Sequence, residues 1–195
     1  MRAEQEGLVE HYGQLAKATS LSIVVYQRDN VILTPETAAR LAAIDSCLGV
    51  KDGLGDWPLL EQQRKSAPEG FRIVGGLPTA ELDAERYRAL GATGYSSAVL
   101  NFLPELAVTF RRALDEGRTD SVRRLLREFF EPFARLRDQV GGYAVTLVKA
   151  AVGLRFGPVG EPRAPLLAPT PEHLEELQRL IVVGLNLAND ENRAG

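Results

Sequence analysis

Two residues that can do chemistry each end a short apolar segment of the sequence. Tyr26 ends residues 20–26, and Lys51 ends residues 47–51. Burial removes part of the hydration of a lysine amine, which lowers its pKa and leaves some of the amine neutral. A neutral amine attacks a carbonyl carbon to form a Schiff base, and a phenol beside it can carry protons for the intermediate. The pair therefore predicts carbonyl chemistry. The structural alternatives are an ion pair between Lys51 and Asp52 and a Tyr26 that is merely buried.

Other polar or flexible residues follow the same kind of segment. Arg28 could hold a substrate carboxylate through a two-pronged contact, or it could pair with Asp29. The pair Gly75-Gly76 follows residues 71–74, where glycines either let a substrate approach the backbone or form a tight turn. The hydroxyls of Ser96-Ser97 end a further segment. These side chains are candidates for substrate binding.

The segments that must position these residues alternate with helical patterns. Four short segments predict strands, and each is followed by a helix that Pro, Thr or acidic residues open. The predicted strands are 20–26, 47–51, 71–74 and 93–97, and the predicted helices are 4–18, 34–44, a segment that Asp56 caps, 79–90 and 104–117. This alternation is typical of parallel sheets, whose ligands bind at the carboxyl ends of the strands. We expect an α/β fold, and an open doubly wound sheet is the alternative to a barrel.

The remainder of the sequence is predicted to be helical. An apolar stripe runs through residues 122–136, and Pro132 predicts a kink in it. Further helices are predicted at 143–154 and 170–183, with a Pro-rich loop between them. The tail from Asn186 is expected to be frayed.

The composition narrows the classes of function. The chain has 195 residues, 45% of them hydrophobic, and a net charge of −3, which indicates a soluble globular protein. We expect no nucleic-acid partner because no basic stripe is present, and no membrane partner because no apolar run approaches about 18 residues. Residues 1–18 do not have the pattern of a signal peptide. The single Cys47 fits a reducing cytoplasm, and with only His11 and His173 it cannot build a zinc cluster.

Four motifs together carry a resemblance to a known family. They are Y-Q-R-D-N (26–30), V-K-D-G-L-G-D (50–56), G-G-L-P-T-A-E (75–81) and G-Y-S-S-A-V-L-N-F-L-P-E (94–105). On these motifs the chain resembles the dihydrodipicolinate synthase and N-acetylneuraminate lyase superfamily. Within it, R-D-N after the tyrosine and S-S-A-V-x-N-F resemble the 5-dehydro-4-deoxyglucarate dehydratase family. The likeness spans residues 4–183.

The resemblance implies a fold. It predicts the C-terminal portion of a class I aldolase-type (β/α)8 TIM barrel, strands 5–8, followed by C-terminal helices. Residues 1–117 would form the partial barrel, and residues 118–195 would pack on it as helices of the same domain. A complete barrel typically has about 250 residues, so the chain is expected to begin near the helix before the fifth strand.

The resemblance also implies an activity, a lyase of glucarate catabolism. Lys51 would form the Schiff base and Tyr26 would handle protons. The residues that would line the substrate site are Arg28, Asn30, Gly76, Ser96 and Ser97. The enzyme would remove water and CO2 from 5-dehydro-4-deoxyglucarate, a 2-keto sugar diacid, and leave 2,5-dioxopentanoate.

Several further expectations accompany that activity. The covalent lysine would make metals and organic cofactors unnecessary, and the superfamily suggests a homo-oligomer. Two alternatives remain at this point: an aldolase or lyase of the same superfamily that acts on another 2-keto acid, and an inactive truncated remnant or interaction module.

Overall fold

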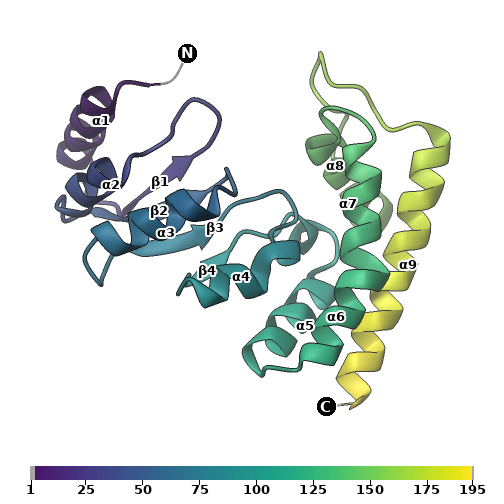
Figure 1. Cartoon of the computed structure of the whole chain (residues 1–195). Coiled ribbons are helices and arrows are strands. Elements are labelled where there is room, and N and C mark those ends of the chain that lie inside the picture. The colour runs from purple at the N-terminus through teal and green to yellow at the C-terminus, as the bar shows by residue number, and fades with distance from the viewer. Residues whose placement is uncertain (1–2, 195) are drawn as a thin grey trace. The chain divides into compact units, whose positions relative to one another are not determined.

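The computed structural model describes residues 3–194. Contacts between residues divide the chain into two compact units, Met1–Ser96 and Ser97–Gly195, which are described in turn (Figure 1). The predicted arrangement, a partial barrel over residues 1–117 and helices over 118–195 in one domain, stays a prediction. Within residues 3–194, no helix is both long and apolar enough to cross a membrane.

The first unit contains a parallel sheet and the helices that connect its strands (Figure 1). The strands are β1 (Ile23–Gln27), β2 (Cys47–Asp52), β3 (Arg72–Gly75) and β4 (Gly94–Tyr95). The helices are α1 (Gln5–Ala18), α2 (Pro35–Ala42), α3 (Trp57–Ser66), the 3-10 turn η1 (Ala80–Asp83) and α4 (Ala84–Ala89). The alternation of strands and helices predicted from the sequence is confirmed.

The strands lie side by side in chain order, β1-β2-β3-β4, and each neighbouring pair is parallel. Each right-handed crossover here leads to the next strand in the same direction across the sheet. The helices of such crossovers all lie on one face of the sheet. A doubly wound sheet instead reverses its order and carries helices on both faces. The consecutive order is that of a (β/α)8 barrel segment. The partial-barrel fold is therefore confirmed, and the doubly wound alternative is wrong.

The two faces of the sheet differ in burial. Along β1, Ile23, Val25 and Gln27 are buried, whereas Val24 and Tyr26 are 47% and 37% exposed. The buried face packs against all four helices, which contribute Leu8, Leu41, Leu60 and Tyr87 to the core. We call the other face, which carries Val24 and Tyr26, the open face. Among the described residues of this unit, no helix layer covers the open face.

Side-chain caps explain where two helices of the first unit begin. Thr34 accepts a hydrogen bond from the backbone N–H of Thr37 at 3.1 Å, and Asp56 accepts one from Leu59 at 3.2 Å. Each bond satisfies a backbone donor that the first helical turn leaves free. Both predicted caps are confirmed.

Two segments of the first unit differ from the prediction. The helix expected over residues 79–90 is divided into η1 and α4, because the backbone leaves helical geometry at Asp83, where φ is −113° and ψ is 12°. The strand expected over residues 93–97 is only Gly94–Tyr95. β4 is the last strand of the sheet, and beyond Tyr95 its pairing continues only in one bond, from Ser96 N–H to Gly75 O at 2.8 Å.

The second unit is built of helices among its described residues (Figure 1). They are the 3-10 turn η2 (Val99–Asn101), α5 (Pro104–Asp115), α6 (Thr119–Leu125), the π-helical turn η3 (Leu126–Phe130), α7 (Glu131–Asp138), α8 (Tyr143–Phe156) and α9 (Pro171–Ala194). In η3 the N–H of Glu131 donates to Leu126 O. Pro132, which follows, has no N–H to donate to the turn before it. The structure therefore has a wide π-helical turn where the sequence predicts a kink.

The apolar stripe over these helices supplies an aromatic core. Phe129, Phe130 and Phe133 are buried. Phe129 stacks on Phe133 with ring centroids 5.9 Å apart, and Phe110 meets Phe130 edge to face at 4.9 Å. The aromatic rings of α5, η3 and α7 thus fill one interior, as the spacing of the stripe predicts.

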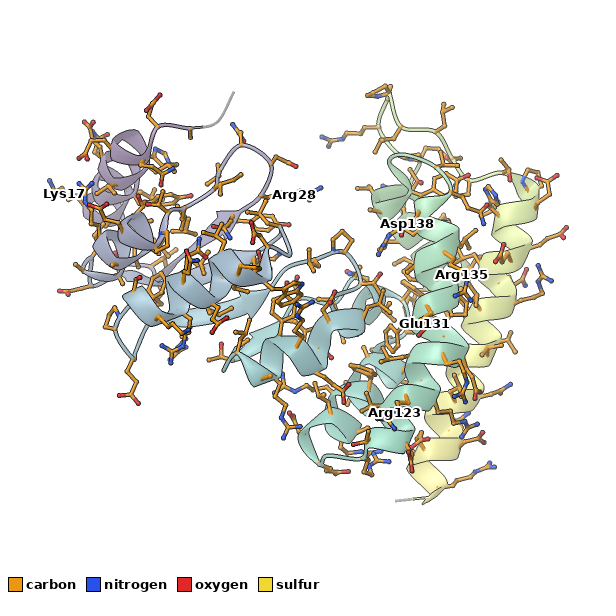
Figure 2. All side chains as sticks on the ribbon, viewed as in Figure 1. Lys17, Arg28, Arg123, Glu131, Arg135 and Asp138 are labelled. Atoms are coloured by element: carbon orange, nitrogen blue, oxygen red, sulfur yellow. The ribbon has the colours of Figure 1, made fainter. Side chains whose placement is uncertain are left out.

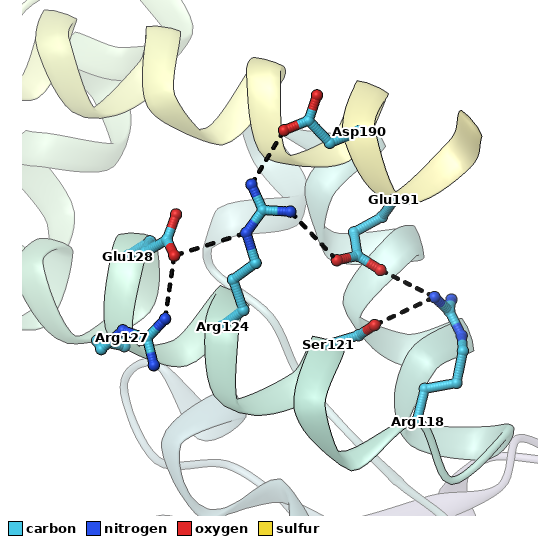
Figure 3. Close-up of polar contacts among 7 residues, drawn as sticks. All are labelled: Arg118, Ser121, Arg124, Arg127, Glu128, Asp190 and Glu191. Carbon is cyan, nitrogen blue, oxygen red and sulfur yellow. Dashed lines mark hydrogen bonds and ion pairs between the residues drawn. The ribbon is translucent and has the colours of Figure 1, made fainter. Parts of the chain in front are cut away.

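The tail is helical, so the prediction of a frayed end is wrong. α9 continues to Ala194. Figure 3 shows why: Glu191, which is 5% exposed, accepts a hydrogen bond from Arg118 at 2.8 Å and pairs with Arg124 at 3.7 Å. Arg124 also donates to Asp190 at 3.0 Å. These partners lie 73 and 66 positions apart in the chain, which a local sequence pattern cannot reveal.

Candidate active site

Tyr26 and Lys51 lie beside each other at the carboxyl ends of β1 and β2. They are register partners in the sheet, so their side chains leave the same face. Lys51 Nζ lies 4.5 Å from the centroid of the Tyr26 ring. That distance is a cation–π contact when the amine is protonated. It also places amine and phenol within reach of one small molecule bound between them. The two residues predicted to carry the chemistry are therefore brought together.

Asp52 is not the partner of Lys51. Its carboxylate lies on the buried face, where it accepts hydrogen bonds from the hydroxyl of Tyr87 at 2.7 Å and from the N–H of Leu54 at 3.0 Å. Among residues 3–194 no carboxylate forms an ion pair with Lys51. The structural alternative of a Lys51–Asp52 pair is wrong.

Two glycines leave room for the pair. A Cβ on Gly76 would lie 2.7 Å from Lys51 Cγ and 2.6 Å from the backbone oxygen of Asp52. A Cβ on Gly53 would lie 2.8 Å from Cε2 of the Tyr26 ring. Gly76 is thus required by the stem of Lys51 and Gly53 by the ring of Tyr26. Whether Gly76 also contacts a substrate stays a prediction.

The Tyr26 hydroxyl faces both a backbone acceptor and a cation. It donates to Gly76 O at 3.4 Å, and Nη1 of Arg28 donates to it at 3.5 Å. The hydrogen bond and the charge of Tyr26, together with the charge of Asp29, raise the pKa of the Arg28 guanidinium. Arg28 also pairs with Asp29 at 3.3 Å. The structure therefore contains the Arg28–Asp29 ion pair that is the structural alternative and, in addition, a contact between Arg28 and the Tyr26 phenol.

Buried amides fix the loop that holds Arg28 and Asn30. Gln63 donates to Oε1 of Gln27 at 2.7 Å and to the backbone oxygen of Leu33 at 2.6 Å, on either side of this loop. Arg28, labelled on the loop after β1 in Figure 2, is half exposed. Asn30 is exposed, and its backbone oxygen accepts a hydrogen bond from Ala3 N–H. The structure shows no contact between the side chain of Asn30 and the Tyr26–Lys51 pair.

The two predicted serines have different surroundings. Ser96 is exposed, and its hydroxyl donates to Gly75 O at 3.5 Å, next to Gly76. Ser97 opens the second unit, where its hydroxyl accepts a hydrogen bond from Leu100 N–H at 3.2 Å. Within the first unit, the structure therefore collects Tyr26, Lys51, Arg28 and Gly76 and brings Ser96 to the neighbouring strand end. Their roles toward a substrate stay predictions.

The other three lysines lie in helices and not at strand ends. Lys65 pairs with Glu61 at 2.7 Å on α3, and Lys149 donates to Val159 O at 3.2 Å. Lys17 lies on the exposed side of α1, as labelled in Figure 2. Lys51 differs from all three because it stands at a strand end against an aromatic ring.

Sequence reasoning missed the buried polar residues beneath the site. Gln27, Asp52 and Tyr87 are 0%, 0% and 1% exposed. The available signal was the period-2 alternation of strands, which points the residue after Tyr26 and the residue after Lys51 toward the helices. Buried polar groups of this kind need partners, and these have them. Among the described residues, no cluster of His, Cys, Asp and Glu could hold a metal ion.

Comparison with known proteins agrees with this geometry. A "Probable 5-dehydro-4-deoxyglucarate dehydratase 1" from Streptomyces avermitilis is 49% identical over 192 residues, covering 96% of this chain and 61% of that protein. The protein of the same description from Streptomyces coelicolor is 50% identical over 193 residues, with 96% and 61% covered. The chain thus spans 61% of the length of these curated relatives.

A solved structure shows the same fold. The 4-hydroxy-tetrahydrodipicolinate synthase of Methylacidiphilum fumariolicum SolV superposes with a TM-score of 0.81 at 26% identity, covering 98% of this chain and 63% of that one. The profile of the Dihydrodipicolinate synthetase family matches residues 1–183. The family predicted from the strand-end motifs is therefore confirmed, and this chain belongs to the dihydrodipicolinate synthetase family.

Proposed function

We propose that this chain supplies the Schiff-base chemistry of a 5-dehydro-4-deoxyglucarate dehydratase. The observation that carries the proposal is the Lys51–Tyr26 pair, an amine without a carboxylate partner that lies 4.5 Å from a phenol ring on the open face. The descriptions of relatives that are 49% and 50% identical support the choice of substrate.

The first half of the proposed reaction removes water. The Lys51 amine adds to the keto carbon of the substrate and loses water to give an iminium. The positive nitrogen acidifies the neighbouring CH2, and Tyr26 removes one of its protons. The enamine formed then expels the hydroxyl of the next carbon, which leaves with a proton as water. A conjugated iminium remains on Lys51.

The second half removes CO2. The bond to the far carboxylate breaks, and its electron pair moves through the conjugated system to the iminium nitrogen. Return of protons to carbon and hydrolysis of the iminium release 2,5-dioxopentanoate and the free lysine. Overall, one substrate gives one 2,5-dioxopentanoate, one CO2 and one water. Because Lys51 is the electron sink in both halves, this mechanism uses neither a metal nor an organic cofactor.

The substrate is a diacid, so its recognition needs cations or N–H donors. Arg28, which reaches the Tyr26 hydroxyl, is the proposed ligand of one carboxylate. Asn30, Gly76, Ser96 and Ser97 are proposed to complete the substrate site. We also propose a homo-oligomer in the cytoplasm. The free and buried Cys47 supports a reducing compartment, and light scattering of the purified chain would test the oligomeric state.

The proposal is tested by product analysis on the purified chain. With 5-dehydro-4-deoxyglucarate we expect release of CO2 together with 2,5-dioxopentanoate. Lys51→Arg should lose this turnover by more than about 1,000-fold, because the guanidinium cannot form the iminium. Lys149→Arg is the matched control and should retain it.

Three results would overturn the proposal. Release of pyruvate instead of CO2 would assign the chain to the aldolases of its superfamily. Equal turnover by the Lys51→Arg variant would remove the lysine from the mechanism. Absence of any product from the unmodified chain would indicate that the chain is an inactive remnant.

A further inference from the structure

Tyr87 of α4 contacts the ends of β2 and β3, the first through its hydroxyl and the second through its ring. The side chain is 1% exposed, and the hydroxyl donates to Oδ2 of Asp52 at 2.7 Å. The ring of Tyr87 lies directly against Gly75, the residue before Gly76, since a Cβ on Gly75 would lie 2.8 Å from Cε2 of this ring. Burial and the hydrogen bond to Asp52 raise the pKa of this phenol, so it remains a proton donor. Tyr87 thus contacts Asp52, the residue after Lys51, and Gly75, the register partner of Asp52 in β3.

Asp52 uses its carboxylate to shape the turn that follows Lys51. Besides Tyr87, it accepts hydrogen bonds from the N–H of Leu54 at 3.0 Å and of Gly55 at 3.3 Å. Within this turn, Gly53 N–H donates to the backbone oxygen of Gln27 at 2.8 Å. Since Gly53 lies directly against the Tyr26 ring, the turn forms a wall for that ring.

Gly76 provides a second connection. Its backbone oxygen accepts the hydrogen bond of the Tyr26 hydroxyl at 3.4 Å, and its Cα lies against the stem of Lys51. A shift of Gly76 would therefore move the phenol and the amine together. Its own position is linked to Tyr87 through the preceding residue, Gly75, which packs against the Tyr87 ring.

From these contacts we infer that Tyr87 is a positioning residue, which holds Lys51 against Tyr26 through Asp52 on one side and the Gly75-Gly76 segment on the other. Tyr87 lies in the core of the first unit, on the face opposite to the open face, and does not touch the amine itself. The catalytic meaning of this inference rests on the proposed function. The geometric claim concerns only residues of the first unit.

The geometric claim is tested by lysine labelling. The sequence has only four lysines, Lys17, Lys51, Lys65 and Lys149, so trace acetylation with acetic anhydride can be followed at each by peptide mass spectrometry. In Tyr87→Phe the contact between the amine and the Tyr26 ring is expected to loosen. Lys51 should then react roughly threefold faster relative to Lys17 and Lys149, the change expected for loss of one cation–π contact. The pH profile of its labelling should also shift.

Tyr143→Phe is the matched control. Tyr143 is also buried, and its hydroxyl lies 2.8 Å from Nδ1 of His173 in the second unit. This variant loses a hydrogen-bonded phenol of the same kind and should leave the labelling ratio of Lys51 unchanged. If Tyr87→Phe does not fold, Asp52→Asn, which keeps the shape but weakens the bond to Tyr87, should raise the same ratio.

A second arm separates this inference from the proposed function. Capture of pyruvate on Lys51 in the presence of borohydride should slow roughly tenfold in Tyr87→Phe, because an amine that has moved away from Tyr26 loses the phenol that transfers protons during iminium formation. Unchanged labelling of Lys51 in both variants, or an equal change in Tyr143→Phe, would overturn the positioning role. If labelling changes but the unmodified chain captures no keto acid, the proposed function fails and the positioning role stands.

Discussion

The Tyr26–Lys51 pair of the first unit is far more exposed than the aromatic and charged residues in the core of the second unit. In the second unit Phe129 and Phe133 are buried and stacked, and Glu191 is enclosed by two arginines (Figure 3). In the first unit Tyr26 is 37% exposed and Lys51 is half-buried on a sheet face without a helix layer. The difference teaches that the second unit uses such residues for stability, whereas the first leaves the proposed catalytic pair accessible.

The largest stability effect is expected in the aromatic core of the second unit. Phe129→Ala would remove a buried ring that stacks on Phe133 and meets Phe130 edge to face. We expect a loss of about 3–5 kcal/mol in the free energy of unfolding, measured by urea denaturation with far-UV circular dichroism. Val108→Ala, at a side chain 61% exposed, is the control and should cost under about 0.5 kcal/mol. A loss below about 1 kcal/mol for Phe129→Ala would contradict the comparison.

The next effect concerns reactivity in the first unit. Gly76→Ala would place a methyl group 2.6 Å from the backbone oxygen of Asp52 and 2.7 Å from Lys51 Cγ, so the strand end must shift. We expect the rate of keto-acid capture on Lys51 to fall about 100-fold. Gly70→Ala is the matched control, because no atom lies within 4 Å of its added Cβ. Equal capture rates in the two variants would show that Lys51 does not depend on the position of this strand end.

A moderate effect is expected where the second unit encloses a charge. Glu191→Gln removes the negative charge between Arg118 and Arg124 and leaves both arginines without their buried partner. The free energy of unfolding should fall by about 1–3 kcal/mol. Asp190→Asn, at a side chain 52% exposed, should cost less than about 1 kcal/mol. Equal losses in urea denaturation would mean that burial of Glu191 contributes nothing.

The smallest effect depends on pH in the first unit. Burial, and secondarily the charge of Asp52, raise the pKa of Asp83, against the opposing effect of Arg86. Since the folded state holds this proton more tightly than the unfolded state, stability is greatest below the unfolded pKa. It is lost as the pH rises through the folded pKa. Asp83→Asn should therefore stabilise the chain at pH 7 by less than about 1 kcal/mol.

The stability of Asp83→Asn is measured by urea denaturation, which is monitored through the fluorescence of Trp57. The ring centroids of Trp57 and Tyr87 lie 4.9 Å apart. The gain should shrink as the pH falls toward 3.8, the ordinary value for this carboxyl. Glu85→Gln, an exposed change two residues away in α4, is the control. A gain that grows at acid pH would reverse the assigned sign.

Local sequence patterns were enough for most of the elements and for the Tyr26–Lys51 pair. Caps at Thr34 and Asp56 start helices where the residue types predict them, because the capping bonds span only three positions. Tyr26 and Lys51 could be found because each ends an apolar run, and neighbouring parallel strands bring such ends together. The strand order itself does not follow from the alternation of elements.

Contacts between distant residues could not be predicted in the same way. The bond between Tyr87 and Asp52 joins residues 35 positions apart, and it depends on how α4 packs against β2. The same holds for Glu191 and Arg118, whose contact keeps the tail helical. In both cases the sequence shows a polar residue of ordinary type, and only the packing reveals that it is buried and paired.

The most direct test of the account is to incubate the purified chain with a 2-keto acid and borohydride, digest it, and locate the added mass. The account predicts a reduced adduct on the peptide that contains Lys51 and on no peptide that contains Lys17, Lys65 or Lys149. An adduct on one of those three lysines, or no adduct at all, would contradict the claim that the open face of the first unit holds a reactive amine.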